Sequence, residues 1–267
     1  MYSINIRKIS IGISTALCII HSAAAFAQTA EEKGLQIAQE TKSRDVGWGD
    51  SQTSLKMILR NAAGQESIRE IHTKTLEVSN DGDKSLNVFN HPRDVKGTAF
   101  LSFSHPVGAD DQWLYLPALK RVKRISSRNK SGPFMGSEFA YEDLSSFEVE
   151  KYTYKLLREE PCKGGTCFVL EQKPVDKYSG YTRQLSWIDK SEYRTWKIEF
   201  YDRKDSLLKT LTTNEFKQYL NKYWRAADMN MTNHQTKKTT QLVWSDYQFN
   251  TGLSDDDFNQ NTLKRAK

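Results

Sequence analysis

The residues best suited to chemistry in this sequence are two cysteines, Cys162 and Cys167, which flank the segment 163–166. Two thiols at this spacing could form a structural disulfide, act as a redox pair or contribute to a metal site. Gly164 and Gly165 favour a tight hairpin turn, and the β-type residues on either side would bring the cysteines together. No second Cys or His pair lies nearby to complete a metal site. We therefore predict a disulfide that stabilises a hairpin, by roughly 2 kcal/mol in the chain-entropy model.

Other residue types do not form a catalytic pattern. The segment Met135–Phe139 contains Ser137 but lacks the Gly-x-Ser-x-Gly spacing of a nucleophile elbow. Glu142 and Asp143 are adjacent, so on a strand they would point to opposite faces. The histidines of the chain beyond residue 27 never occur at the i, i+4 spacing of a helical metal site; they are His72, His91, His105 and His234. We predict a protein that is not an enzyme and uses no metal or cofactor.

Aromatic and apolar residues are concentrated between Asp110 and Leu144. In the run 112–117, Trp113 and Tyr115 would share one face of a strand, whereas Leu114 and Leu116 would share the other. Neither face is suited to solvent, so both faces are expected to be covered. Two interpretations fit: a sheet with a core on one side and helices on the other, or a sheet curved around an apolar pocket.

Six basic residues and no acidic ones lie between positions 120 and 130. On a strand they would lie beside apolar residues, an arrangement that we interpret as the rim of a cavity. Arg121 and Arg124 could bind an internal carboxylate such as Asp143, or the phosphate or acyl ester of a lipid headgroup. Both alternatives remain open at the level of sequence. The segment 133–137 is rich in Gly, Ser and Pro, so Phe134 and Met135 would form an apolar flap or a loop that completes the core.

The N-terminus has the pattern of an export signal. Arg7 and Lys8 precede the apolar run 9–20, and the small-residue site Ala25-Phe26-Ala27 follows. We predict cleavage after Ala27, which removes residues 1–27 and leaves residues 28–267 as a single domain in the periplasm. An uncleaved membrane anchor is disfavoured because polar residues interrupt the run. Export to an oxidising compartment also favours the predicted disulfide.

Composition limits the remaining classes of protein. The chain has 267 residues, 37% of them hydrophobic, and a formal net charge of +6. These values exclude an integral membrane bundle, and the low Gly and Pro content excludes collagen-like and low-complexity proteins. A mild positive charge without a recognised module does not indicate nucleic-acid binding.

The pattern of the mature chain predicts a mainly β fold. A capping box at Thr29–Glu32 begins a helix that extends to about residue 41, and an N-capped closing helix is expected from Ser254. Asn80–Asp83 predicts a hairpin turn. Period-two runs begin at Leu55, and further strands are expected near 67–79, 85–91, 95–104, 112–117, 119–127, 147–159, 166–173, 181–189, 193–202, 206–213, 216–224 and 238–248. So many short strands favour one large antiparallel sheet, curved or partly closed, with a few helices.

At the segments 113–126, 134–137 and 141–144, the chain resembles the exported outer-membrane lipoprotein-sorting proteins of the LolA superfamily of periplasmic lipoprotein carriers. The resemblance implies an incomplete β-barrel closed by helices, with an apolar cavity that shelters acyl chains and performs no catalysis. It implies lipoprotein or lipid cargo, an outer-membrane acceptor and, for this subgroup, an inner-membrane RND-type transporter. The alternative function is a periplasmic binding subunit of such a transporter that carries no cargo itself.

On this basis the residues predicted to bind cargo share apolar or aromatic character or lie at the basic rim; they are Trp113, Tyr115, Leu116, Arg121, Arg124, Phe134, Met135, Phe139 and Tyr141. Asp143 is the predicted partner of a structural latch. A carrier must bury such cargo, because exposing an acyl chain of ~15 methylenes to water costs about 12 kcal/mol at ~0.8 kcal/mol each.

Overall fold

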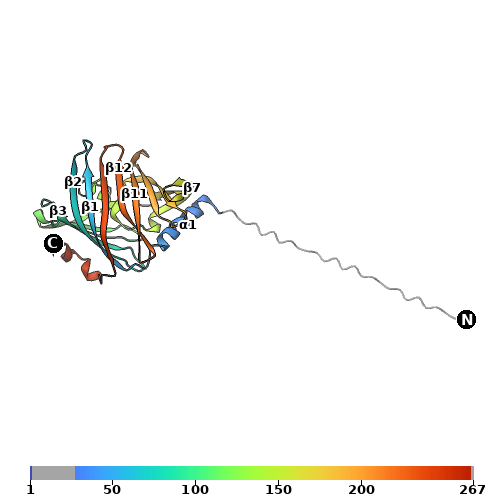
Figure 1. Ribbon diagram of the computed structural model, residues 1–267, viewed down its shortest axis with the longest axis horizontal. Coiled ribbons are helices and arrows are strands. Elements are labelled where there is room, and N and C mark those ends of the chain that lie inside the picture. The colour runs from blue at the N-terminus through green and yellow to red at the C-terminus, as the bar shows by residue number, and fades with distance from the viewer. Residues whose placement is uncertain (2–27, 266–267) are drawn as a thin grey trace.

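One continuous antiparallel sheet dominates the computed structural model, which describes residue 1 and residues 28–265 and contains thirteen strands within that range (Figure 1). The predicted signal peptide lies outside the described residues. The strands are β1 Asp50–Arg60, β2 Glu66–Leu76, β3 Lys84–His91, β4 Ala99–Phe103, β5 Asp111–Leu116, β6 Arg121–Ile125, β7 Tyr152–Cys162, β8 Gly165–Pro174, β9 Tyr181–Asp189, β10 Thr195–Asp202, β11 Leu207–Tyr219, β12 Tyr223–Asn233 and β13 Thr239–Phe249. The α-helices within the described residues are α1 Ala30–Ser43 and α2 Gln260–Arg265.

The strand order places β1 against β13 at the centre of the sheet. From there β2 to β6 follow in sequence on one side, and β12 back to β7 follow on the other. Strands β6 and β7 are therefore the two edges, and the sheet does not close on itself. This arrangement confirms the predicted class: a large curved antiparallel sheet with few helices.

The helices cover different parts of the sheet. Helix α1 packs against β7, whereas α2 contacts β4, β5 and β6 near the opposite edge (Figure 1). The predicted capping box of α1 is present: the Glu32 backbone N–H donates to Thr29 Oγ1 at 3.1 Å, and the Thr29 N–H donates to Glu32 Oε2 at 2.8 Å. No helix within residues 28–265 combines the length and the apolar character that a membrane span requires.

The hydrophobic core divides between the two faces of the sheet. On one face, side chains such as Phe89, Phe100 and Met231 pack around Phe134 from the segment 126–151 that joins the edges. On the other face, Phe258 and Leu263 from the C-terminal region cover β3 to β5. The expectation that both faces of the 112–117 strand are covered is confirmed.

Two details of the predicted strands are wrong. The run 206–213 and the first part of the run 216–224 form one strand, β11, because bulges near Thr213 and Glu215 bend it without ending it. Residues 220–222 form a turn, and the last two residues of the second run begin β12. Strand β12 was not predicted, because Asp228, Asn230 and Asn233 have low β-propensity. The closing helix is also divided: Asp255–Asp257 is a 3-10 turn, and α2 follows it.

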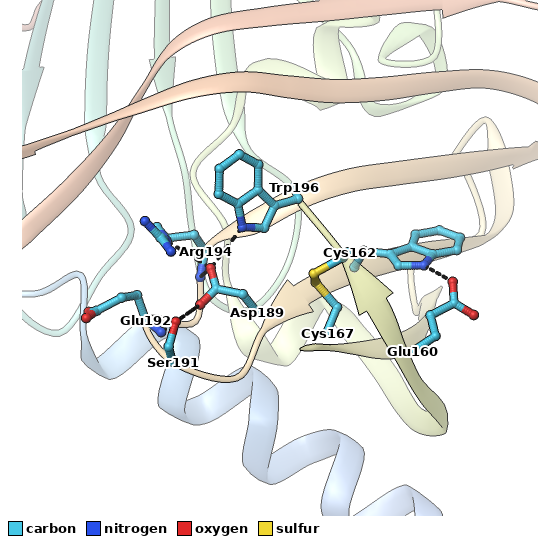
Figure 2. The surroundings of a disulfide bond; sticks show 9 residues. Glu160, Cys162, Cys167, Asp189, Ser191, Glu192, Arg194 and Trp196 are labelled. Carbon is cyan, nitrogen blue, oxygen red and sulfur yellow. Dashed lines mark hydrogen bonds and ion pairs between the residues drawn. A yellow bond between two sulfur atoms is a disulfide. The ribbon is translucent and has the colours of Figure 1, made fainter. Parts of the chain in front are cut away.

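The predicted disulfide between Cys162 and Cys167 is present and joins β7 to β8 across the turn at residues 163–164 (Figure 2). Only one of the two glycines has positive φ, namely Gly165 at +104°. Gly164 is required for packing instead, because a Cβ there would lie 2.2 Å from Trp196 Nε1. The tip of the hairpin therefore lies directly against β10.

Candidate functional site

A cavity of about 850 Å³ lies on the face of the sheet that bears the segment 126–151. Helix α1, that segment and strands β8 to β12 contribute to its lining. Its apolar floor is formed largely by alternate residues on neighbouring strands, because side chains two positions apart point to the same face. The floor residues are Phe139, Ile198, Phe200, Leu211, Met229 and Met231.

An uncharged polar strip on β8 and β9 adjoins this floor. Gln172, Gln184 and Ser186 line the cavity and are buried by the surrounding chain. The Ser186 hydroxyl donates to Gln172 Oε1 at 2.7 Å. Because this strip can satisfy its own hydrogen bonds, it does not require a charged occupant.

Ion pairs fasten the segments around the cavity. Lys130 Nζ lies 2.6 Å from Asp176 Oδ2 on the loop after β8, and Lys42 of α1 lies 3.1 Å from Glu148. Lys151 pairs with Asp110 before β5. The charges near the cavity are thus largely matched within the protein. Two apolar residues in the cavity lining are largely exposed to solvent: Val107 is 82% exposed and Val175 is 61% exposed.

Glu142 is a partly buried acid in the cavity wall. The Gly180 backbone N–H donates to its Oε1 at 2.8 Å, and the Ser179 hydroxyl donates to its Oε2 at 2.8 Å. Burial nevertheless raises the pKa of the Glu142 carboxyl above its usual range, and the neighbouring Asp143 carboxylate acts in the same direction. Protonation of this wall residue is therefore easier than for an exposed glutamate.

Asp143 forms a buried ion pair, and its partner is Lys209 of β11. Lys209 Nζ lies 2.6 Å from Asp143 Oδ2, and the two side chains are 4% and 6% exposed. The Tyr181 hydroxyl donates to Asp143 Oδ1 at 2.8 Å, and Lys209 also donates to the Glu138 carbonyl at 2.9 Å. This network ties the segment 138–143 to the sheet. The sequence indicated an internal partner for Asp143 but named Arg121 or Arg124 for that position.

Of the predicted cargo residues, Phe139 alone is part of the cavity lining among the described residues. Phe134 is a core residue, with its ring centroid 5.1 Å from that of Phe100; Leu116, Met135 and Tyr141 pack against the same cluster. Trp113 and Tyr115 lie on the other face of the sheet, in the cluster that contains Phe258 and Leu263.

Arg121 and Arg124 do not lie at the cavity rim. Both are exposed on β6, and Arg124 pairs with Asp111 on the neighbouring strand. The sequence prediction took the alternation of basic and apolar residues in this segment as a sign of a cavity rim. The alternation instead reflects an edge strand whose Val122 and Ile125 pack inward on opposite faces of the sheet.

The cavity wall also contains an aromatic cluster that the sequence analysis did not identify. Arg194 and Trp224 line the cavity, and the Arg194 guanidinium carbon lies 4.6 Å from the ring centroid of Trp224 and 5.3 Å from that of Trp196. Its Nε donates to Asp189 Oδ2 at 2.8 Å (Figure 2). Burial alone would raise the pKa of Asp189, but hydrogen bonds from the Glu192 backbone N–H, Ser191, Arg194 and Trp196 lower it.

Within residues 28–265, no three His, Cys, Asp or Glu side chains are grouped closely enough to hold a metal ion. The sequence analysis did not identify the other residues of the cavity floor. One pattern pointed to them: Met229 and Met231 alternate, which places two flexible apolar side chains on one face of a strand. Without the pairing of β12 to β11, that signal does not reveal which face encloses a cavity.

Comparisons with known proteins identify similar chains. A family model described as an uncharacterized protein matches residues 81–265. A domain from Vibrio parahaemolyticus named for outer membrane lipoprotein sorting is 66% identical, with a TM-score of 0.87, over 88% of this chain and 100% of that one. A DUF1329 family protein from Desulfovibrio piger is 30% identical over the same shares, with a TM-score of 0.84.

A LolA superfamily protein from Nitrosomonas europaea shares the fold, with 22% identity and a TM-score of 0.69 over 88% of this chain and 100% of that chain. No curated protein matches the sequence at a significant level.

Proposed function

This chain belongs to the family of the outer membrane lipoprotein-sorting domain and the DUF1329 protein, with a LolA-like fold, and on that premise we propose that it is a periplasmic carrier of acylated cargo. In this proposal the cavity shelters the acyl chains of lipoproteins or lipids. The carrier then passes its cargo toward the outer membrane. The observation that carries the proposal is the apolar floor beneath a cavity of about 850 Å³.

The size and chemistry of the cavity suit an amphiphile. Its volume of about 850 Å³ lies within the ~300–1,000 Å³ range of ligand sites. The floor at Ile198, Met229 and Met231 offers apolar surface, and methionine side chains adapt to irregular chains. Phe139 is the residue of the predicted cargo set that we place against the acyl chain. Four other apolar members belong to the same core cluster as Phe139, namely Leu116, Phe134, Met135 and Tyr141, whereas Trp113 and Tyr115 lie on the other face of the sheet.

Loading and release require the cavity to change shape, because a tightly bound acyl chain must also leave. The segment 138–143 forms part of the wall and is fastened by Asp143 and Lys209. We assign this ion pair the role of the latch. The wall would move as a unit when the pair separates.

The proposal places the mature domain, residues 28–267, in the periplasm after cleavage behind Ala27. The Cys162–Cys167 disulfide suits an oxidising compartment. An inner-membrane RND-type transporter would supply the cargo, and an outer-membrane acceptor would receive it.

The proposed carrier is not an enzyme. Ser137, the weak nucleophile candidate, is 2% exposed, and its hydroxyl donates to the Phe134 carbonyl at 2.7 Å. A nucleophile must reach its substrate, so a buried hydroxyl in this hydrogen bond is poorly placed for catalysis.

Titration with a fluorescent fatty acid and with an acylated peptide tests the proposal. Met229→Trp places a larger side chain in the cavity from β12 and should weaken acyl binding at least about fivefold, because the indole occupies volume that the acyl chain would fill. Asn230→Trp is the matched control, because Asn230 is the next residue on the same strand and does not line the cavity.

Saturable binding by the unmodified protein that only Met229→Trp weakens would support the carrier. If neither probe binds, the proposal fails, and a transporter subunit without cargo becomes the better account. Equal losses in both variants would place the acyl site elsewhere.

A further inference from the structure

The edge strand β6 carries cations that the cavity does not use. Lys120, just before β6, is exposed, and so are Arg121, Lys123 and Arg124 on the strand. Within residues 28–265, β6 pairs only with β5. Arg124 pairs with Asp111, whereas the other three have no ion-pair partner within residues 28–265. We refer to Leu119 and these four cations as the basic edge.

Leu119 gives the basic edge an apolar tip. It ends the 3-10 turn Pro117–Leu119 and is 63% exposed, although Leu116, three residues earlier, packs in the core. Lys120 follows with a left-handed backbone, at φ 47° and ψ 36°.

The C-terminal helix adds further charge to this end of the molecule. Helix α2 contacts β6, and Leu263 packs in the same cluster as Val122. The next two residues, Lys264 and Arg265, are exposed. Two exposed cations from far away in the sequence therefore lie on a helix that contacts β6.

One simple explanation covers only part of this pattern. Charged side chains on an edge strand prevent it from pairing with other chains, which would account for Arg121 and Lys123. It does not account for Leu119, because an exposed leucine beside an open edge would promote association. An apolar tip followed by three cations that have no ion-pair partner among the described residues is instead the pattern of a surface that binds the interface of an anionic membrane.

We propose that the basic edge docks the protein on a bilayer that contains anionic phospholipids. Leu119 enters the headgroup region, and Lys120, Arg121 and Lys123 bind the lipid phosphates. From Ile125 the chain continues to Lys130, which lines the cavity, so docking holds the cavity near the membrane. Strand β6 spans only about 17 Å, at ~3.3 Å per residue. This inference concerns the outer surface and does not depend on acyl binding inside the cavity.

Co-sedimentation with vesicles tests the docking surface. We expect the protein to bind vesicles of phosphatidylglycerol and phosphatidylcholine, but not vesicles of phosphatidylcholine alone, and to dissociate as salt increases. The double variant Arg121→Gln/Lys123→Gln should lower partitioning about 25-fold, at roughly fivefold per cation. Leu119→Ser should lower it at least about tenfold, the lower end of the contribution of an inserted leucine.

Lys237→Gln/Lys238→Gln is the matched control. It removes the same charge from two exposed lysines in the turn between β12 and β13. This variant should retain vesicle binding, and so should Met229→Trp, because neither alters the basic edge. Circular dichroism and thermal unfolding establish that each variant is folded.

Three results would overturn the inference: no binding to anionic vesicles at low salt, equal losses in the control and the basic-edge variants, or loss in Met229→Trp alone. If the protein does not bind anionic vesicles at low salt, an acidic protein becomes the better candidate partner of this surface. The last would show that vesicle binding reflects lipid uptake by the cavity. If the unmodified protein binds anionic vesicles but neither acyl probe, the carrier proposal is contradicted and the docking surface is not.

Discussion

Replacing Lys209 by methionine tests the buried ion pair that fastens the cavity wall. Lys209→Met retains most of the side-chain volume but leaves the Asp143 carboxylate, 6% exposed, without its cation. Removing one partner of a buried pair costs about 3–5 kcal/mol, because the other charge stays in a poorly solvated site. The Glu138 carbonyl also loses the donor that lies 2.9 Å away. We expect a loss in the free energy of unfolding within that range.

Thermal and urea unfolding measure this loss. For a domain of this size, ~1 kcal/mol shifts the melting temperature by about 2–4 °C, so Lys209→Met should lower it by roughly 6–20 °C. Lys190→Met is the control: Lys190 and Glu159 are 42% and 44% exposed, and such surface pairs contribute at most about 1 kcal/mol.

A double-mutant cycle separates the pair from its surroundings. Asp143→Asn keeps the shape of the side chain and one carbonyl acceptor for Tyr181 or the Ala140 N–H. We expect the double variant to be more stable than the sum of the two single losses predicts, by about 1–3 kcal/mol. The reasoning would be refuted if Lys209→Met resembled Lys190→Met, or if the two losses simply added.

Three further predictions concern other parts of the chain. Reducing the disulfide, or the variant Cys162→Ser/Cys167→Ser, should lower the free energy of unfolding by roughly 2 kcal/mol in urea titrations, and equal stability with and without reductant would contradict this. Gly164→Ala should cost about 1–3 kcal/mol, because the new Cβ would lie 2.2 Å from Trp196 Nε1; an unchanged melting temperature would show that the hairpin tip is not held against β10. His105 loses solvation on burial, but hydrogen bonds to Asp81 and Asp111 outweigh that effect and raise its pKa above the value of the unfolded chain. Its contribution to stability should therefore be complete below the unfolded pKa of ~6.5 and be lost as pH rises through the folded pKa. Urea titrations of the protein and of His105→Gln should accordingly differ more at acidic than at alkaline pH, and a constant difference would refute the assignment.

The sequence predicts the fold well where local signals are strong. The capping box at Thr29, the period-two strands and the hairpin at Cys162 and Cys167 depend on neighbouring residues, and each is present. Strand β12 was missed because its polar residues have low β-propensity, and the pairing with β11 and β13 overrides that preference. Such pairing is invisible in one sequence.

The candidate site is harder to predict because its residues are brought together by long-range pairing. Phe139 was identified from the segment 133–144, but the floor comes from β10, β11 and β12, far along the chain. The partner of Asp143 is 66 residues away in β11, so no local pattern could favour Lys209 over a nearer arginine. The cluster of cations near residue 120 was identified, whereas its position at a sheet edge required the strand order.

The most direct test of the carrier is native mass spectrometry, with lipid extraction, on the mature protein purified from the periplasm without detergent. The account predicts a bound acyl species, whose mass identifies the cargo class, and its depletion in Met229→Trp but not in Asn230→Trp. A protein that is empty, and that also fails to take up added lipids and acylated peptides, would contradict the central claim.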